Sequence, residues 1–343
     1  MNRRRLLLSS AYALGTPFLV ACGPSAKEQE VIRQLVESMR PFAFSRYVID
    51  LPAGFAITTG SRVILTYGLT ADFVTTEVEV LETSADKAKL KALVANRAAQ
   101  FAGEQHEKLK SSMLAANLAI SETASLLRRF DDYSLTEYFN CELYALVGDT
   151  IVLAKASVYN NNIAPVEARL TRLLSQMTRP AGTAQAGKGF MLGPVLIDTG
   201  HDQERSLLTL HDATQPDVWV QIYTTAISVD PEKSLIQRGD ANEPLVRAAG
   251  VTWDTLRKGQ TRIAGMEADE VLIGYKQDGK TGYLFEAESR RAHPSFERQM
   301  LDIELQSGFL SGGRPAESSW SKAEMLAVWN ALIKSVKLRP GAV

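Results

Sequence analysis

The chain has 343 residues, of which 45% are hydrophobic and 22% charged, and its formal net charge is -1. This composition is typical of a folded protein, and the length is enough for two cores of about 150 residues each. The basic run Arg3 to Arg5 lies at the extreme N-terminus, and without it 35 basic residues face 39 acidic ones, a net charge of -4. Nucleic-acid binders concentrate basic residues, so we expect no nucleic-acid partner.

The N-terminus has the pattern of an export signal. The arginines precede an apolar stretch, residues 6–20, that is interrupted by Ser, Gly and Pro and is too short for a comfortable membrane span. Leu19 to Cys22 resembles the bacterial lipobox, in which the chain is cut before a cysteine that receives the lipid. We therefore expect residues 1–21 to be a lipoprotein signal peptide and Cys22 to carry the membrane anchor.

The residue after the lipidated cysteine bears on the final location. Gly23 stands where an Asp usually retains such lipoproteins at the inner membrane, so the sequence favours the periplasmic face of the outer membrane. The arginines also resemble a twin-arginine signal, and the choice between the two export routes stays open. Residues 22–40 are expected to form a tether and a short helix.

Cys141 is expected to be a buried structural thiol. If Cys22 bears lipid, Cys141 has no partner for a disulfide within the chain. It lies in an apolar alternation, residues 138–147, and nothing nearby suggests the electropositive, partly exposed setting that a nucleophilic thiol needs.

A closing helix at residues 320–340 organises the second half of the chain. Ser321 and Glu324 form a capping box, Trp320 can staple onto Met325, and the cations Lys334, Lys337 and Arg339 suit the last turn. Its buried face is predicted to comprise Met325, Val328, Trp329, Leu332, Ile333 and Val336.

A similar helix is predicted from Pro165, with an apolar stripe through Met177, and the following Arg179 to Gly182 echoes Arg339 to Ala342. Two similar modules are therefore expected, one at residues 41–180 and one at residues 190–343. The small, polar, Gly-rich residues 181–189 are the predicted linker between them.

Strands outnumber helices in both modules. In the first module, strands are predicted at 47–51, 62–69, 72–83, 116–130, 135–147 and 150–158, with a helix capped by Ser84. In the second, they are predicted at 190–197, 207–210, 218–229, 270–275, 283–288 and 299–306, with a short helix capped by Asp230. Because turns rather than crossover helices join most strands, each module should be an antiparallel sheet with helices packed on it, an α+β fold.

Motifs of common enzymes are absent from the sequence. It contains no Gly-x-Ser-x-Gly elbow, His-Glu-x-x-His, Cys-x-x-Cys, Walker loop or calcium loop. His201-Asp202 and His211-Asp212 are interpreted as solvated turns rather than a metal pair. We expect no metal, no cofactor and no enzymatic activity.

Two alternatives stay open. Ser84 to Lys87, Tyr159 to Asn161 and Lys280 to Gly282 occur in the chain order of the motifs of penicillin-recognising serine acylases. Such short motifs also arise by chance, and a helix cap, a turn and a hairpin account for these three. A ligand-binding lipoprotein with its site between the modules is the other alternative.

Several segments resemble a known family. Residues 261–272, 301–308 and 329–342 resemble, in order and spacing, the C-terminal domain of the immunity proteins that neutralise type VI secretion lipase effectors, and residues 45–52 look like that family's N-terminal domain. The chain departs from the pattern at Ala268-Asp269-Glu270, where Gly-Glu-Glu is common, and at Ser45, where a cysteine is frequent. The resemblance implies a non-enzymatic periplasmic inhibitor that binds a cognate phospholipase effector and protects the producing cell.

Two loops are the predicted contacts with that effector, because aromatic and Arg side chains dominate interface energetics. They lie at residues 289–296 and 308–319, and the second holds an apolar pair among glycines. The alternative is that this pair folds back over the sheet edge. The predicted partner-binding residues are Arg290, Arg291, His293, Phe309, Leu310 and Arg314.

Overall fold

The computed structural model describes residues 24–69, 73–182, 186–227, 233–248, 250–290, 294–310 and 313–343. The predicted signal peptide, Cys22, the Asp230 cap, Arg291 and His293 lie outside these ranges.

One long antiparallel sheet runs through the described part of the chain, which confirms the α+β class. Its 13 strands follow the order β15-β16-β17-β18-β14-β13-β4-β5-β9-β8-β7-β6, and β3 (Phe55–Ile57) pairs with β13 beside this path. In the first module the strands are β4 (Arg62–Tyr67), β5 (Val74–Glu82), β6 (Leu114–Ser121), β7 (Ala124–Phe130), β8 (Tyr138–Val147) and β9 (Thr150–Tyr159). In the second they are β13 (Gln203–Asp212), β14 (Trp219–Thr225), β15 (Thr252–Ile263), β16 (Met266–Gln277), β17 (Lys280–Ser289) and β18 (Met300–Ser307).

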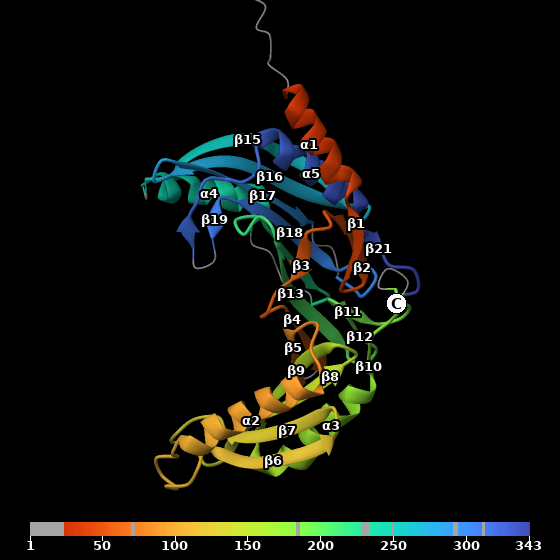
Figure 1. Cartoon of the computed structure of the whole chain (residues 1–343), viewed down its shortest axis with the longest axis vertical. Coiled ribbons are helices and arrows are strands. Elements are labelled where there is room, and N and C mark those ends of the chain that lie inside the picture. Colours follow the sequence, from red (N-terminus) through yellow and green to blue (C-terminus); the bar gives the residue numbers. More distant parts are fainter. Residues whose placement is uncertain are drawn as a thin grey trace, which may run out of the picture.

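The two modules repeat the same arrangement. Each has two strands, a helix, a run of four antiparallel strands and a closing helix, and β4 of the first pairs with β13 of the second at the middle of the sheet. Figure 1 shows the resulting sheet running from β15 at one end of the molecule to β6 at the other. The two predicted modules are thus halves of one continuous sheet.

The modules exchange their first hairpins. β1 (Arg40–Phe44) pairs with β2 (Tyr47–Leu51), and β2 pairs with β21 (Lys337–Leu338), which follows the closing helix of the second module. In the same way β11 (Phe190–Leu192) pairs with β12 (Val195–Ile197), and β12 pairs with β10 (Met177–Thr178), which follows the closing helix of the first module. The two hairpins also contact each other through a small apolar cluster, Ala43, Val48, Met191 and Leu196.

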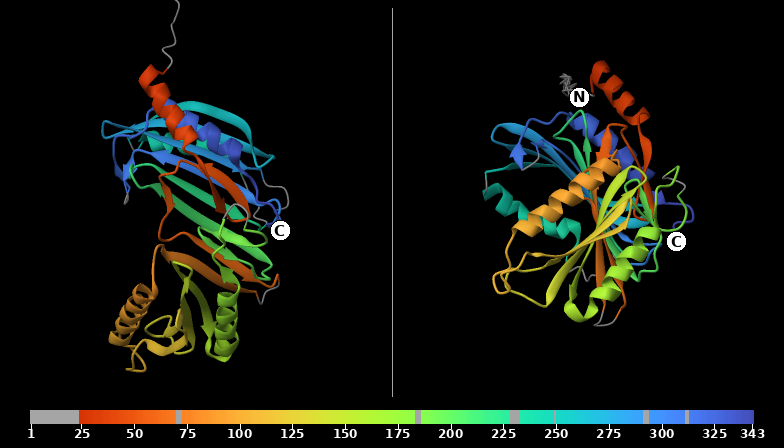
Figure 2. Two further views of the ribbon diagram at one scale, coloured as in Figure 1. Left: turned by 45° about the vertical axis from the view of Figure 1, so that its right-hand side comes forward. Right: turned by 60° about the horizontal axis from the view of Figure 1, so that its bottom comes forward.

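Helices cover both faces of the sheet. α3 (Ile163–Ser175) and α5 (Lys322–Ser335) pack on one face of the sheet, over the main apolar core, and we call this the covered face. α1 (Ala26–Glu37) lies along α5. α2 (Lys87–Gly103) packs on the opposite face near β6 to β8, and α4 (Leu235–Ala248) lies over β15 and β16. The left view of Figure 2 shows α2 (orange) and α3 (green) on opposite sides of the yellow strands.

The start of α5 is as predicted and its end is not. Ser321 and Glu324 form the capping box, and Met325, Val328, Trp329, Leu332 and Ile333 are its buried residues. The helix stops at Ser335, however, because Lys337 and Leu338 pair with β2. Arg339 is fully buried and donates to the carbonyls of Gly187 and Gly189, so it does not cap the helix in solvent as expected.

The prediction that Ser84 caps α2 was wrong. Asp86 is the N-cap, and its carboxylate accepts from the Lys89 amide at 2.8 Å, whereas Ser84 has φ 57° in the turn before it. Residues 116–130, predicted as one strand, form most of the β6–β7 hairpin, which turns at Glu122 and Thr123. Cys141 is buried as predicted, and burial raises the pKa of its thiol to about 12.

Candidate functional site

The central strands leave one face of the sheet uncovered between α2 and α4, and we call this the open face. Side chains directly opposite each other in register lie on the same face. One row across this face is Thr209, Gln221, Glu304 and Glu286, from β13, β14, β18 and β17. The next row is His211, Trp219, Gln306 and Leu284.

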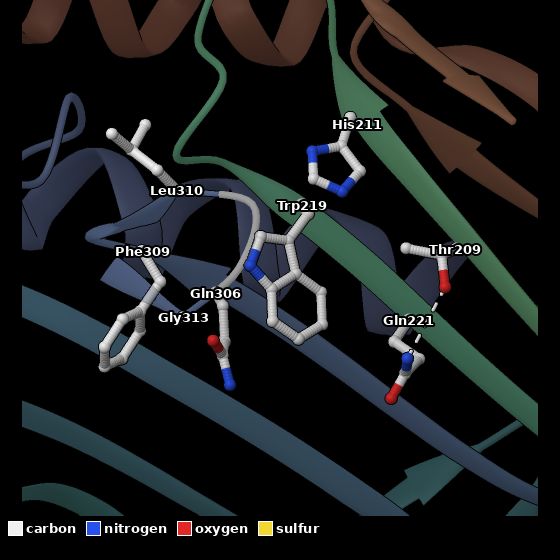
Figure 3. Close-up of a pocket in the computed structure, with 8 residues that line it drawn as sticks. All are labelled: Thr209, His211, Trp219, Gln221, Gln306, Phe309, Leu310 and Gly313. Carbon is white, nitrogen blue, oxygen red and sulfur yellow. Dashed lines mark hydrogen bonds between the residues drawn. The ribbon is translucent and has the colours of Figure 1, made fainter. Parts of the chain in front are cut away.

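A pocket of about 430 Å³ opens on these rows, with Trp219 at its centre (Figure 3). Its lining residues are Thr209, His211, Trp219, Gln221, Gln306, Phe309, Leu310 and Gly313. The rings of His211 and Trp219 stack with their centroids 6.4 Å apart, and Gln221 donates to the hydroxyl of Thr209 at 3.4 Å. Burial lowers the pKa of His211, so this imidazole is neutral at pH 7 and adds apolar surface.

Glycines allow the aromatic wall of the pocket to form. The ring of Phe309 stacks on Tyr275 with a centroid separation of 5.3 Å, and the Tyr275 hydroxyl donates to the carbonyl of Ser307 at 3.2 Å. A Cβ at Gly282 would collide with that hydroxyl, and one at Gly308, where φ is +104°, would lie 2.7 Å from the Gly282 Cα. Only glycine fits at both positions, which fixes Phe309 over Tyr275.

Asp217 holds the base of the loop that carries Phe309. Its carboxylate accepts from the Ser307 hydroxyl at 2.8 Å, from the Gly308 amide at 3.1 Å and from the Ser319 amide at 2.9 Å. Burial alone would raise the pKa of Asp217, but these hydrogen bonds prevail and lower it. The loop is therefore anchored by an ionised carboxylate at neutral pH.

Carboxylates dominate the open face beside the pocket. Glu286 and Glu304 lie opposite each other, and Asp302 and Glu288 form the neighbouring pair. Burial, followed by the charge of Glu304, raises the pKa of Glu286 to about 7. Burial and the charge of Asp302 raise the pKa of Glu304 to about 7 as well, so part of this acidic patch is protonated near neutral pH.

The described members of the predicted partner-binding set fall in two places. Phe309 and Leu310 form β19, which pairs with Arg314 and Pro315 of β20, and both are half-buried in the pocket wall. Arg314 is exposed beside them. Arg290, by contrast, follows the other end of β17, where it pairs with Asp269 at 2.8 Å. Phe309 and Leu310 therefore do not project freely into solvent. They also do more than cover the sheet edge, because they line an open pocket.

Sequence reasoning missed Trp219 and His211. Residues 218–229 were predicted as a strand. In that strand the buried Val218 and Val220 alternate with Trp219 and Gln221, so Trp219 lies on the polar face. An aromatic residue at a polar-face position could have indicated a binding surface from the sequence.

The prediction of solvated turns was wrong for both histidines, because His211 lies on β13 with its ring against Trp219 and His201 is buried. The Nε2 of His201 lies 2.5 Å from Glu204, and both side chains are buried.

The other candidate sites do not assemble. Ser84 follows β5, whereas Lys280 lies on β17, and four strands separate β5 from β17, which corresponds to about 24 Å. Among the described residues, no group of three or more His, Cys, Asp or Glu is placed to hold a metal ion. Within the same ranges, no helix is both long and apolar enough to cross a membrane.

Residues 183–341 match the family model of the Tle cognate immunity protein 4 C-terminal domain. The predicted family is thereby confirmed for this part of the chain. The Tle cognate immunity protein 4 match contains every residue that lines the pocket. No match was found among curated proteins.

Solved structures show the same fold over nearly the whole chain. The apo structure of the type VI secretion immunity protein TplEi from Pseudomonas aeruginosa is 19% identical, with a TM-score of 0.64 over 89% of this chain and 98% of TplEi. The crystal structure of the Tle4–Tli4 complex contains a chain that is 18% identical to this one. Its TM-score is 0.65, and the match covers 89% of this chain and 99% of that chain. TplEi complexed with an "L" peptide is also similar, at 19% identity and a TM-score of 0.59 over 88% and 99% of the two chains.

Proposed function

We propose that this chain is an immunity protein that binds a cognate lipase effector of a type VI secretion system and inhibits it. The observation that carries the proposal is the match of residues 183–341 to the Tle cognate immunity protein 4 C-terminal domain. The full-length similarity of fold to TplEi and to a chain of the Tle4–Tli4 complex supports it, because both modules are present in the same arrangement.

The open face is the proposed contact surface. It spans both modules, and α2 and α4 bracket it at its two ends (Figure 1). An uncovered sheet face that carries Trp219 and Phe309 around a pocket has the aromatic content that protein interfaces concentrate at their centres. A stable specific complex should bury on the order of 1,600 Å² in total, and that area requires contacts from both modules.

The proposal includes the location. The charged and apolar N-terminus with its lipobox supports a periplasmic lipoprotein anchored through Cys22, beside the membrane that a phospholipase attacks. An anchor raises the local concentration of the inhibitor without any new contact. Inhibition would be stoichiometric, and no catalysis by this chain is part of the proposal.

A protection assay tests the proposal. A lipase effector from the same organism is directed to the periplasm of a sensitive host, with and without the full-length chain. We expect growth to be restored only by co-expression, and we expect a catalytically inactive lipase to co-purify with the chain. Lysis at the same rate in both strains would refute the proposal.

A further inference from the structure

We infer that the pocket and the adjacent carboxylates form one recognition patch for a protein segment that presents a bulky apolar side chain next to an arginine or lysine. The inference rests on the proposed function and specifies the chemistry of the effector surface that docks here. Its residues are Trp219, Phe309 and Leu310 for the apolar side chain, and Glu304 and Glu286 for the cation.

The apolar half of the patch is a preformed pocket. Trp219 and Phe309 remain partly exposed although Phe309 stacks on Tyr275, and Leu310 closes one side of the pocket. The glycine contacts and the Asp217 hydrogen bonds fix this wall in advance, so little conformational entropy is lost when a side chain enters. A volume of about 430 Å³ is larger than any one side chain needs, so a large aliphatic or aromatic residue fits.

The charged half has no ion pair of its own among the described residues, although the nearby charge of Arg238 partly offsets the rise that burial causes in the pKa of Glu286. Neither Glu286 nor Glu304 has an Arg or Lys nitrogen within 4.0 Å in the described part of the chain. The nearby cations are engaged elsewhere, since Arg238 of α4 pairs with Glu288 at 2.8 Å and Lys258 pairs with Asp240. The ionised form of this facing pair is disfavoured in the free protein, and an incoming cation would stabilise it.

The two halves are contiguous. Gln306 lines the pocket and donates from its side chain to Glu304, and Gln221 lines the pocket directly opposite Glu304. Diagonal neighbours on an antiparallel sheet are separated by about 7 to 8 Å, which is the spacing from Trp219 to Glu304. Neighbouring side chains on one face of a partner lie about 5 to 6 Å apart on a helix and about 7 Å apart on a strand. These spacings are close enough for one short segment to reach both halves.

The test measures the affinity of the purified lipase for the full chain by calorimetry. Trp219→Ala and the double variant Glu286→Gln/Glu304→Gln are each expected to weaken binding at least tenfold. Their matched controls are Leu338→Ala and Glu122→Gln, which alter exposed residues of β21 and of the β6–β7 turn, away from the open face, and should change affinity less than twofold. The melting temperature of each variant shows that it is folded.

Salt dependence separates charge recognition from loss of packing. Raising NaCl from 0.1 to 0.5 M should weaken lipase binding by the unchanged chain more than binding by the double glutamine variant. The reason is that salt screens an electrostatic attraction that this variant lacks. Affinities equal to those of the controls, or equal salt dependence in the two proteins, would overturn the inference and leave the proposed function intact. An unchanged chain that binds no lipase would refute the proposed function, and this inference would fall with it. A patch that instead joins two copies of the chain, seen as a dimer lost in Trp219→Ala, would also overturn it.

Discussion

The guanidinium of Arg46 lies 2.8 Å from the carboxylate of Glu204, and both side chains are almost fully buried. Arg46 belongs to the turn of the first hairpin and Glu204 to β13, so the pair ties the exchanged hairpin to the middle of the sheet. Arg46 also donates to the carbonyl of Ala342 at 2.6 Å, and Gln299 donates to Glu204. Three segments that are far apart in the sequence therefore meet at one polar cluster: the first hairpin, β13 and the C-terminal end.

Arg46→Met should destabilise the protein by about 3 to 5 kcal/mol, because it leaves Glu204 charged, buried and without its main partner. Burial alone would raise the pKa of Glu204, but the hydrogen bonds from Arg46 and His201 outweigh burial and lower it. The ionised carboxylate therefore stabilises the fold above its unfolded pKa, and this contribution is lost as pH falls through the lower folded value. Urea unfolding at pH 7 and pH 4 measures both effects.

Arg33→Met is the control, since the ion pairs of Arg33 with Glu30 and Glu37 on α1 are exposed. Exposed pairs of this kind contribute little. Equal losses of stability in the two variants would mean that burial of the Arg46 pair has no energetic consequence.

Trp329→Ala should cost about 3 to 5 kcal/mol of stability, because this fully buried ring packs edge-on against Phe285 and its N–H donates to Glu270 at 3.0 Å. Leu338→Ala, at an exposed strand position, should change stability by less than about 0.5 kcal/mol. Chemical denaturation gives both values. A Trp329→Ala variant that unfolds like the unchanged protein would show that α5 is peripheral to the core.

The facing pair Glu286 and Glu304 should make stability fall as pH rises. Each folded pKa is about 7, above the ordinary value of 4.5, so the folded state holds extra protons between these limits. Their favourable contribution is complete below pH 4.5 and is lost as pH rises through 7. Glu304→Gln should therefore raise stability at pH 8, by about 1 to 2 kcal/mol after allowance for solvent screening, and by much less at pH 5. Melting curves at both pH values check this, and a variant less stable than the unchanged chain at pH 8 would contradict it.

Local patterns were sufficient to predict the fold class and the presence of α2, α3 and α5, although not the residue that caps α2. The apolar stripe of α5 and its capping box follow from spacings within a few residues, and the structure has both. The end of α5 could not be predicted, because β21 pairs with β2, a strand nearly the whole chain away in sequence. The same long-range pairing buries Arg339, which local rules place in solvent at a helix end.

The candidate site was predictable only in part. An apolar pair among glycines pointed to Phe309 and Leu310, and both line the pocket. Trp219 and Glu304 come from strands whose alternation says which residues share a face but not which strand lies beside which. Their meeting depends on the pairing of β14 with β18, and that pairing skips α4 and three strands of the sequence.

Cys22→Ser should move the protein from the membrane fraction to the soluble periplasmic fraction, because the lipobox cysteine is the proposed site of lipidation. Fractionation followed by immunoblotting measures the shift, with the unchanged chain as reference. A variant that keeps the wild-type distribution would mean that something other than a lipid on Cys22 holds the protein at the membrane.

Titration of the purified lipase with the full-length chain tests the central claim most directly. We expect phospholipid hydrolysis to fall in proportion to added chain and to be abolished near one equivalent, with a stable complex of the two proteins on a sizing column. Undiminished hydrolysis at a tenfold excess of folded chain, with no complex, would contradict the account.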